Sequence, residues 1–263
     1  MLQTLPRCKT SSGAAYLERG EGRETLVLIH GVGMRIEAWQ PQIDQLADRF
    51  RVIAVDLPGH GFSEALEGAP GLSLYVGWFR RFLEEVAGEP VNVAGHSMGA
   101  LIASGIVATA PAMVRRVALL NGVHRRGTDA RTAVEARARE IGSGAFDRVA
   151  PLSRWFSADE ESTEAYALVR DLLQAVDPAG YAAAYAAFAS GDAVYADCWP
   201  QIECPSLFLT GDGDLNSTTV MARDMAAAAR RGRAVVIEGH RHMVNLTAPN
   251  AVNRALADWL ETS

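Results

Sequence analysis

The sequence predicts an α/β protein built on a mostly parallel sheet that helices cover on both faces. From residue 25 onward, short apolar segments alternate with longer helical ones, which is the pattern of parallel strands joined by helices. The chain has 263 residues, of which 49% are hydrophobic, so it can bury one large core. We therefore expect a single large sheet-based domain.

The elements can be placed in order from the apolar runs. An antiparallel edge hairpin is expected from Leu2–Cys8 and Ala14–Glu18. Parallel strands are expected at 25–29, 51–55, 91–94, 114–120, 206–210 and 234–237. A helix before Gly88-Glu89-Pro90 carries an apolar stripe that is typical of core packing, and Pro249 opens the last helix.

A serine between two glycines follows one of these strands. Gly95-His96-Ser97-Met98-Gly99 stands between the apolar run 91–94 and a long apolar helix. This is the sequence form of a nucleophile elbow, a sharp strand-to-helix turn that presents a serine hydroxyl. Ser97 is therefore the candidate nucleophile.

Acids and histidines follow the serine at later strand ends. The strand at 206–210 leads into Gly211-Asp212-Gly213-Asp214, and the strand at 234–237 leads into Glu238–Met243. Serine, acid and histidine thus occur in the chain order of a Ser-Asp-His triad. The residues leave Asp212 and Asp214 open as the acid, and His240 and His242 as the base. Histidines 30 and 60 lie in turns, where hydrogen bonds to local backbone are expected.

With His30-Gly31-Val32-Gly33 and the run 56–61 after earlier strands, these motifs resemble the α/β-hydrolase superfamily of serine esterases, lactonases and carbon–carbon hydrolases over nearly the whole chain. The resemblance implies the α/β-hydrolase fold: a mostly parallel eight-stranded sheet flanked by helices, with a helical cap inserted after strand 6. It also implies roles for particular residues. These are Ser97 as nucleophile, Asp214 as acid, His242 as base, and the backbone N–H groups of Val32 and Met98 as the oxyanion hole.

Between residues 124 and 200 the strand pattern lapses and helical stretches dominate. We expect this segment to be the cap and residues 1–123 and 201–263 to form the core. Caps at this place shape the substrate pocket, and arginines in it would bind an acidic substrate. The candidate substrate-binding residues are Met34, Arg35, His96, His124, Arg125, Arg126, Arg154, Trp155, Phe156 and Tyr185.

The expected reaction is hydrolysis of a small carboxylic ester, lactone or related acyl compound through an acyl-enzyme. Two alternatives stay open. One is hydrolysis of a carbon–carbon or amide bond in a catabolic ring-fission product by the same residues. The other is a small-molecule receptor with little turnover.

Charge and composition narrow the expected partners to a small-molecule substrate. A net charge of −6, without a basic cluster interleaved with aromatics, disfavours nucleic acid. No apolar run approaches 20 residues, and the three cysteines lack metal or redox spacing, so we expect a cytoplasmic protein that does not bind membranes. No cofactor or metal site is expected. The oligomeric state, monomer or homodimer, stays open.

Overall fold

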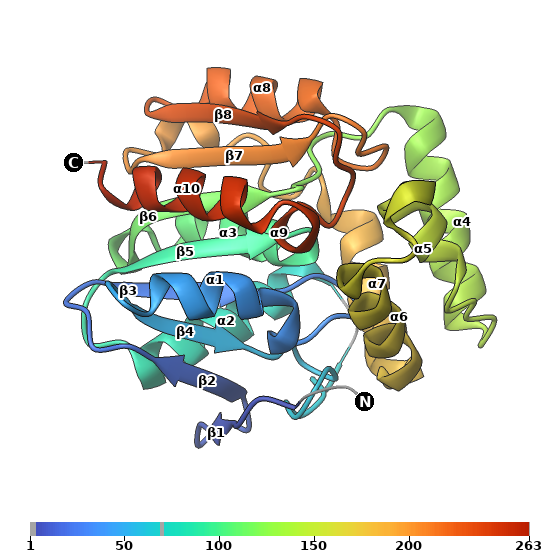
Figure 1. Cartoon of the computed structure of the whole chain (residues 1–263), viewed down its shortest axis with the longest axis horizontal. Coiled ribbons are helices and arrows are strands. Elements are labelled where there is room, and N and C mark those ends of the chain that lie inside the picture. The colour runs from blue at the N-terminus through green and yellow to red at the C-terminus, as the bar shows by residue number, and fades with distance from the viewer. Residues whose placement is uncertain (1–3, 69–70, 263) are drawn as a thin grey trace.

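The computed structural model describes residues 4–68 and 71–262, and in this part of the chain an eight-stranded sheet lies between two groups of helices (Figure 1). The strands are β1 (Cys8–Lys9), β2 (Ala15–Arg19), β3 (Thr25–Ile29), β4 (Arg51–Val55), β5 (Val91–His96), β6 (Val114–Leu120), β7 (Ser206–Gly211) and β8 (Gly232–Ile237). They are ordered β1-β2-β4-β3-β5-β6-β7-β8. The β1–β2 and β2–β4 pairs are antiparallel and the other pairs are parallel, which confirms the mostly parallel sheet.

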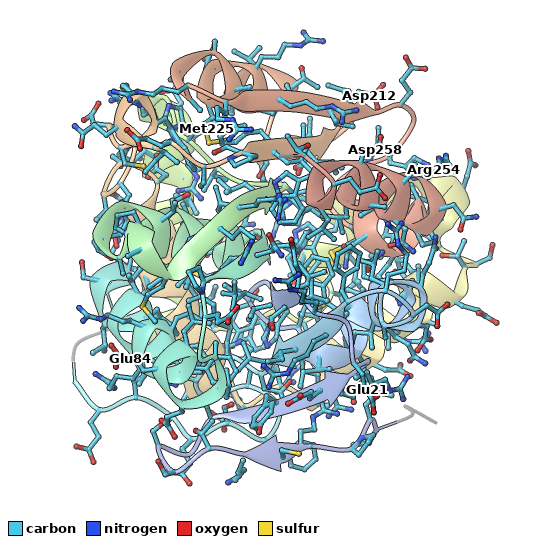
Figure 2. The ribbon with its side chains drawn as sticks, turned by 90° about the vertical axis from the view of Figure 1, so that its left-hand side faces the viewer. Glu21, Glu84, Asp212, Met225, Arg254 and Asp258 are labelled. Carbon is cyan, nitrogen blue, oxygen red and sulfur yellow. The ribbon has the colours of Figure 1, made fainter. Side chains whose placement is uncertain are left out.

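The two helix layers follow from the alternation of strand side chains. Leu26 and Leu28 of β3 point to the face covered by α1 (Gln40–Leu46) and α10 (Pro249–Leu260), with the short α9 (Val244–Thr247). Val27 and Ile29 point to the opposite face, which is covered by α2 (Leu72–Val86), α3 (Met98–Thr109) and α8 (Thr219–Ala228). Figure 2 shows the layers from the side. There Glu84 lies on the outer surface of α2, and Met225 is buried between α8 and the sheet.

The segment between β6 and β7 contains helices and no strand in the described residues. These helices are α4 (Thr128–Gly142), α5 (Ala150–Trp155), α6 (Glu164–Ala175) and α7 (Pro178–Gly191), with 3-10 turns at Ala158–Glu160 and Trp199–Gln201. Two further 3-10 turns, Ile36–Trp39 and Pro111–Met113, lie outside it. Figure 1 shows α4–α7 beyond the carboxyl ends of the parallel strands. We call residues 124–200 the helical segment.

The predicted elements agree with the structure except at the first strand. Residues 2 and 3 of the expected strand Leu2–Cys8 lie outside the described residues, and residues 4–7 are not a strand. The backbone N–H of Leu5 donates to the buried Glu37 carboxylate (2.9 Å) instead of pairing in the sheet, so β1 is only two residues long. The expected hairpin is therefore present but short. The last helix begins at Pro249, as predicted.

No helix among residues 4–68 and 71–262 is both long enough and apolar enough to cross a membrane.

Candidate active site

Ser97 stands at the turn between β5 and α3 in a strained backbone conformation. Its φ of 56° and ψ of −111° lie in a region that side-chain-bearing residues rarely adopt. The flanking glycines make this turn possible. A Cβ on Gly95 would lie 2.0 Å from the carbonyl oxygen of Gly99, and a Cβ on Gly99 would lie 2.1 Å from that of Ile29. The glycine–serine–glycine pattern therefore reflects close backbone packing on both sides of the serine.

Ser97, His242 and Asp214 form a buried chain of hydrogen bonds. The Oγ of Ser97 lies 3.1 Å from Nε2 of His242, and Nδ1 of His242 lies 2.7 Å from Oδ2 of Asp214. The other acid and histidine point elsewhere. Asp212 accepts the N–H of Gly239, and His240 contacts Thr247 and Glu160. Of the two acids and two histidines left open, only Asp214 and His242 are joined to Ser97 by hydrogen bonds in the described residues.

The carboxylate of Asp214 is held by several donors at once. Its Oδ1 accepts the backbone N–H groups of Asn216 (2.8 Å) and Ser217 (3.2 Å), and its Oδ2 accepts the side-chain amide of Asn121 (2.8 Å). Burial alone would raise the pKa of Asp214, but His242 and these donors outweigh burial and lower it below the usual value. Asp214 is therefore ionised and can fix the tautomer of His242 with Nδ1 protonated.

His96 supports the loop that carries His242. Its Nε2 lies 2.8 Å from the carbonyl oxygen of His242, and burial lowers the pKa of His96 to about 3. The ring is therefore neutral and donates its Nε2 proton to that carbonyl. The edge-on ring of Trp39 packs against it (6.4 Å between centroids). His96 thus acts as a structural hydrogen-bond donor and also lines the cavity described below.

The two backbone groups expected to bind an oxyanion belong to Met98, which directly follows Ser97, and to Val32. Met98 is the first residue of α3, so its N–H has no partner within the helix. Val32 lies in the turn after β3. There the next N–H, of Gly33, donates to Nε2 of His60 (3.0 Å) and that of Met34 donates to Gly31 (3.2 Å). Val32 lines the cavity, whereas Met98 is not part of its wall.

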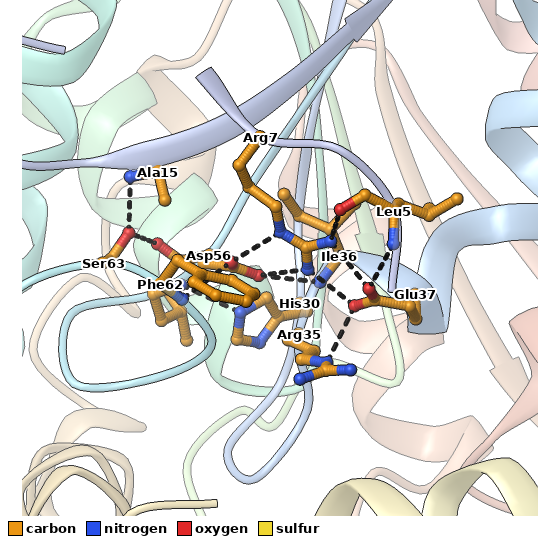
Figure 3. Close-up of polar contacts among 11 residues, drawn as sticks. Leu5, Arg7, Ala15, His30, Arg35, Ile36, Glu37, Asp56, Phe62 and Ser63 are labelled. Carbon is orange, nitrogen blue, oxygen red and sulfur yellow. Dashed lines mark hydrogen bonds and ion pairs between the residues drawn. The ribbon is translucent and has the colours of Figure 1, made fainter. Parts of the chain in front are cut away.

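A buried charge network beneath this turn fixes its position (Figure 3). Arg7 lies 2.6 Å from both carboxylate oxygens of Glu37 and 3.1 Å from Oδ2 of Asp56. Asp56 also accepts the backbone N–H of Ile36 (2.9 Å), so it ties the turn to the end of β4. His30 completes the support, because its Nε2 accepts the N–H of Leu57 (2.9 Å). The Nδ1 atoms of His30 and His60 lie 2.8 Å and 3.1 Å from the carbonyl oxygens of Gly31 and Pro58, so both histidines bond local backbone, as predicted.

A cavity of about 320 Å³ opens onto Ser97 and His242. Core residues form one side of its wall and the helical segment forms the other. Six of the ten predicted substrate-binding residues line it: Met34, His96, Arg126, Arg154, Trp155 and Tyr185.

The other four predicted binding residues lie outside the cavity wall. Arg35 turns back to pair with Glu37 (2.9 Å), and Arg125 points to solvent, where it pairs with Asp197. Phe156 is buried against Tyr166 (5.2 Å between ring centroids). His124 lines a separate small pocket beside Asp192. Position next to a strand end or an aromatic pair did not fix the direction of these side chains.

Sequence reasoning missed Arg137, which lines the cavity from α4. Ala130, Ala133 and Val134 line it from the same helix, and with Arg137 they follow the three- and four-residue spacing of one helix face. An arginine on a face of otherwise small apolar residues was the signal available in the sequence. The loop after Asp214 was also missed, since Leu215 and Asn216 line the cavity too.

The cavity arginines differ in how their charges are balanced. Arg126 pairs with the buried Asp192 (3.3 Å), and its guanidinium carbon lies 4.4 Å from the centroid of the Phe188 ring. Within the described residues, neither Arg137 nor Arg154 forms an ion pair. Burial, and then the positive charge of Arg137, lower the pKa of Arg154. The cavity therefore carries unneutralised positive charge beside the serine.

Known proteins resemble this chain along nearly its full length. The model of the alpha/beta hydrolase family matches residues 26–255. The (E)-2-((N-methylformamido)methylene)succinate hydrolase of Acinetobacter baylyi is 50% identical over 250 residues, which is 95% of each chain. The 2-(acetamidomethylene)succinate hydrolase of Mesorhizobium japonicum is 27% identical over 93% of this chain and 90% of its own. The crystal structure of the enol-lactonase from Burkholderia xenovorans superposes with a TM-score of 0.85 at 29% identity, covering 98% of this chain and all of that one.

The sheet, the helix layers and these matches agree with the fold expected from the motifs. The chain is therefore a hydrolase that belongs to the alpha/beta hydrolase family.

Proposed function

We propose that this hydrolase cleaves the acyl–nitrogen bond of an N-acylaminomethylene succinate, a small dicarboxylate whose amide nitrogen is attached to a carbon–carbon double bond. The observation that carries the proposal is the placement of Arg137 and Arg154, without ion pairs in the described residues, in the same cavity as Ser97 and His242. The substrate for which the 50% identical relative is named supports it. An amide, which was one of the alternatives, thus replaces a simple ester as the favoured substrate.

In the proposed reaction, Ser97 attacks the acyl carbon and His242 takes the serine proton on Nε2. Asp214 stabilises the resulting imidazolium, and the N–H groups of Val32 and Met98 bind the oxyanion. When the carbon–nitrogen bond breaks, His242 gives its proton to the departing nitrogen, which leaves as an enamine. Water activated by His242 then attacks the acyl-serine and releases the free acid, so the serine regains its proton.

The two carboxylates of the substrate provide the reason for the arginines. Guanidinium groups bind carboxylates through paired, charge-assisted hydrogen bonds. Burial, and then repulsion from Arg137, lower the pKa of Arg154, and an anion that lies between the two arginines relieves that repulsion. In this proposal residues 124–200 act as a cap over the core of residues 1–123 and 201–263, and the cap supplies recognition while the core supplies chemistry.

The test is turnover of synthetic (E)-2-((N-methylformamido)methylene)succinate, and the release of formate is the quantity measured. Wild type is expected to release formate, and Ser97→Ala is expected to lose at least about a thousandfold in kcat, the scale of removing a triad nucleophile. Ser104→Ala is a matched control, since Ser104 is a buried serine of α3 that bonds the carbonyl of Ala100 outside the cavity.

Two results would contradict the proposal. Retained turnover in Ser97→Ala would show that Ser97 is not the nucleophile. If wild type hydrolyses an enol-lactone or a neutral ester but does not hydrolyse the succinate amide, the favoured substrate is again an ester or lactone.

A further inference from the structure

The helical segment covers one face of the histidine. Trp155, the last residue of α5, stacks on the imidazole of His242 with ring centroids 5.6 Å apart and planes inclined by 28°. His96 contacts the same imidazole at 5.0 Å, but at an inclination of 56°. Trp155 also lines the cavity, so it lies both beside the substrate space and against the proposed base.

Three consecutive residues of the core hold Trp155 in this place. Arg241 donates to the carbonyl oxygens of Ser153 (3.0 Å) and Phe156 (2.8 Å) at the end of α5. The backbone N–H of His242 donates to the carbonyl of Trp155 itself (3.3 Å). His240 lies 3.4 Å from Glu160 in the turn that follows α5. The loop that carries His242 therefore also fixes the residue that stacks on it.

We infer that Trp155 is a positioning residue for the base, and that its ring face stabilises His242 while the imidazole is protonated. This inference rests on the proposed function, in which His242 becomes a cation during acyl transfer. The face of an indole ring is electron-rich, so it attracts a cation more than a neutral ring. Because His242 gains its charge only as the reaction proceeds, the stabilisation favours the transition state over the ground state.

The charges around His242 make this contribution useful. Among the described residues, Asp214 is its one hydrogen-bonded counter-charge, and the neighbouring His96 is neutral because burial lowers its pKa to about 3. Arg137 and Arg154 line the same cavity and oppose a further positive charge. His240 faces away, toward Glu160 and Thr247. An aromatic face supports the imidazolium without adding a carboxylate that would repel an anionic substrate.

The experiment compares Trp155→Phe with Trp155→Leu on the succinate amide. Phenylalanine and leucine are both apolar and smaller than tryptophan, but only phenylalanine keeps an aromatic face. We expect kcat to fall in the order wild type, Phe, Leu, with a loss of about threefold to thirtyfold for Leu. The acid limb of the kcat/KM profile should lie at lower pH in Leu than in Phe, because a less stabilised imidazolium has a lower pKa.

Equal rates and equal pH profiles for the Phe and Leu variants would overturn the inference and leave Trp155 as cavity wall alone. If the Leu variant does not fold, fluorinated tryptophans incorporated into wild type keep the shape of the ring while weakening its face. The inference is supported if kcat falls with each added fluorine in wild type but not in the Trp155→Phe variant labelled in the same way. An unchanged kcat in wild type overturns it. Turnover that survives His242→Ala would instead mean that the proposed function itself has failed.

Discussion

The core strand ends and the helical segment contribute to one cavity in opposite ways. Ser97, His242 and Asp214 come from the core, are buried, and are joined by hydrogen bonds to one another. Arg137 and Arg154 come from the helical segment, are partly exposed, and lack ion pairs in the described residues. The proposed chemistry is thus placed on buried core residues that hydrogen bonds join, whereas recognition is placed on two arginines of the helical segment that form no ion pair in the described residues.

This difference predicts two kinds of mutational effect. Substitutions beneath the core turns should lower the free energy of unfolding, because their charges are buried and mutually dependent. Substitutions of cavity-lining residues in the helical segment should weaken substrate binding and leave stability nearly unchanged. Each prediction below tests one side of that comparison.

The largest expected effect on stability is at Arg7. Arg7→Met leaves the buried carboxylates of Glu37 and Asp56 without their main counter-charge, and breaking a buried pair from one side costs about 3–5 kcal/mol. Urea unfolding at pH 7 measures the loss. Arg19→Met is the matched control, because Arg19 pairs with Asp44 on the surface and such pairs contribute up to about 1 kcal/mol. Equal losses for the two variants would contradict the buried-network argument.

The second prediction concerns the helical segment. Arg154→Ala and Arg137→Ala should each lower kcat/KM for the succinate amide by about tenfold to a hundredfold, the scale of one charge-assisted hydrogen bond. Turnover of a neutral activated ester and the unfolding midpoint should stay close to wild type. Arg125→Ala, which removes an exposed arginine of the same segment outside the cavity wall, is the control. If kcat/KM for the neutral ester falls equally, the arginines do not recognise the charge of the substrate.

The same contrast explains what the sequence could predict. The elbow around Ser97 was recognisable because Gly95 and Gly99 meet neighbouring backbone so closely that only glycine fits. The expectation of Asp214 over Asp212 followed from the resemblance, and in the structure Asn121, Asn216 and Ser217 donate hydrogen bonds to Asp214. Such local backbone requirements leave a clear mark in sequence.

The residues of the cavity wall were harder to predict from the sequence, because the direction of a side chain on a helix depends on how the helix packs. Arg125 and Arg126 are adjacent, yet one points to solvent and the other lines the cavity. The short β1 was likewise not predictable from local pattern. Leu5 bonds Glu37, a residue 32 positions away that no periodicity connects to it.

The smallest expected effect is the acid sensitivity of the core. His30 and His60 are buried in core turns and His96 is buried at the end of β5, and burial is the main cause that lowers each pKa, to about 4 for His60 and about 3 for His96. The helical segment carries only His124. Each buried histidine stays neutral in the native state while the unfolded chain takes up a proton below about pH 6.5. Stability should therefore be highest above pH 6.5 and fall as the pH drops, by about 1.4 kcal/mol per pH unit for each histidine.

His60→Gln separates one of these contributions, since a glutamine oxygen can still accept the N–H of Gly33 that Nε2 of His60 accepts. Between pH 6.5 and about 4, the variant should lose stability less steeply than wild type, by about 1.4 kcal/mol per pH unit. Urea unfolding at pH 7, 6 and 5 measures both slopes. Below about pH 4, native His60 takes up its proton too, so the difference should stop growing. If the two proteins have parallel slopes, His60 takes up its proton over the same pH range in the native and unfolded states, and burial does not lower its pKa.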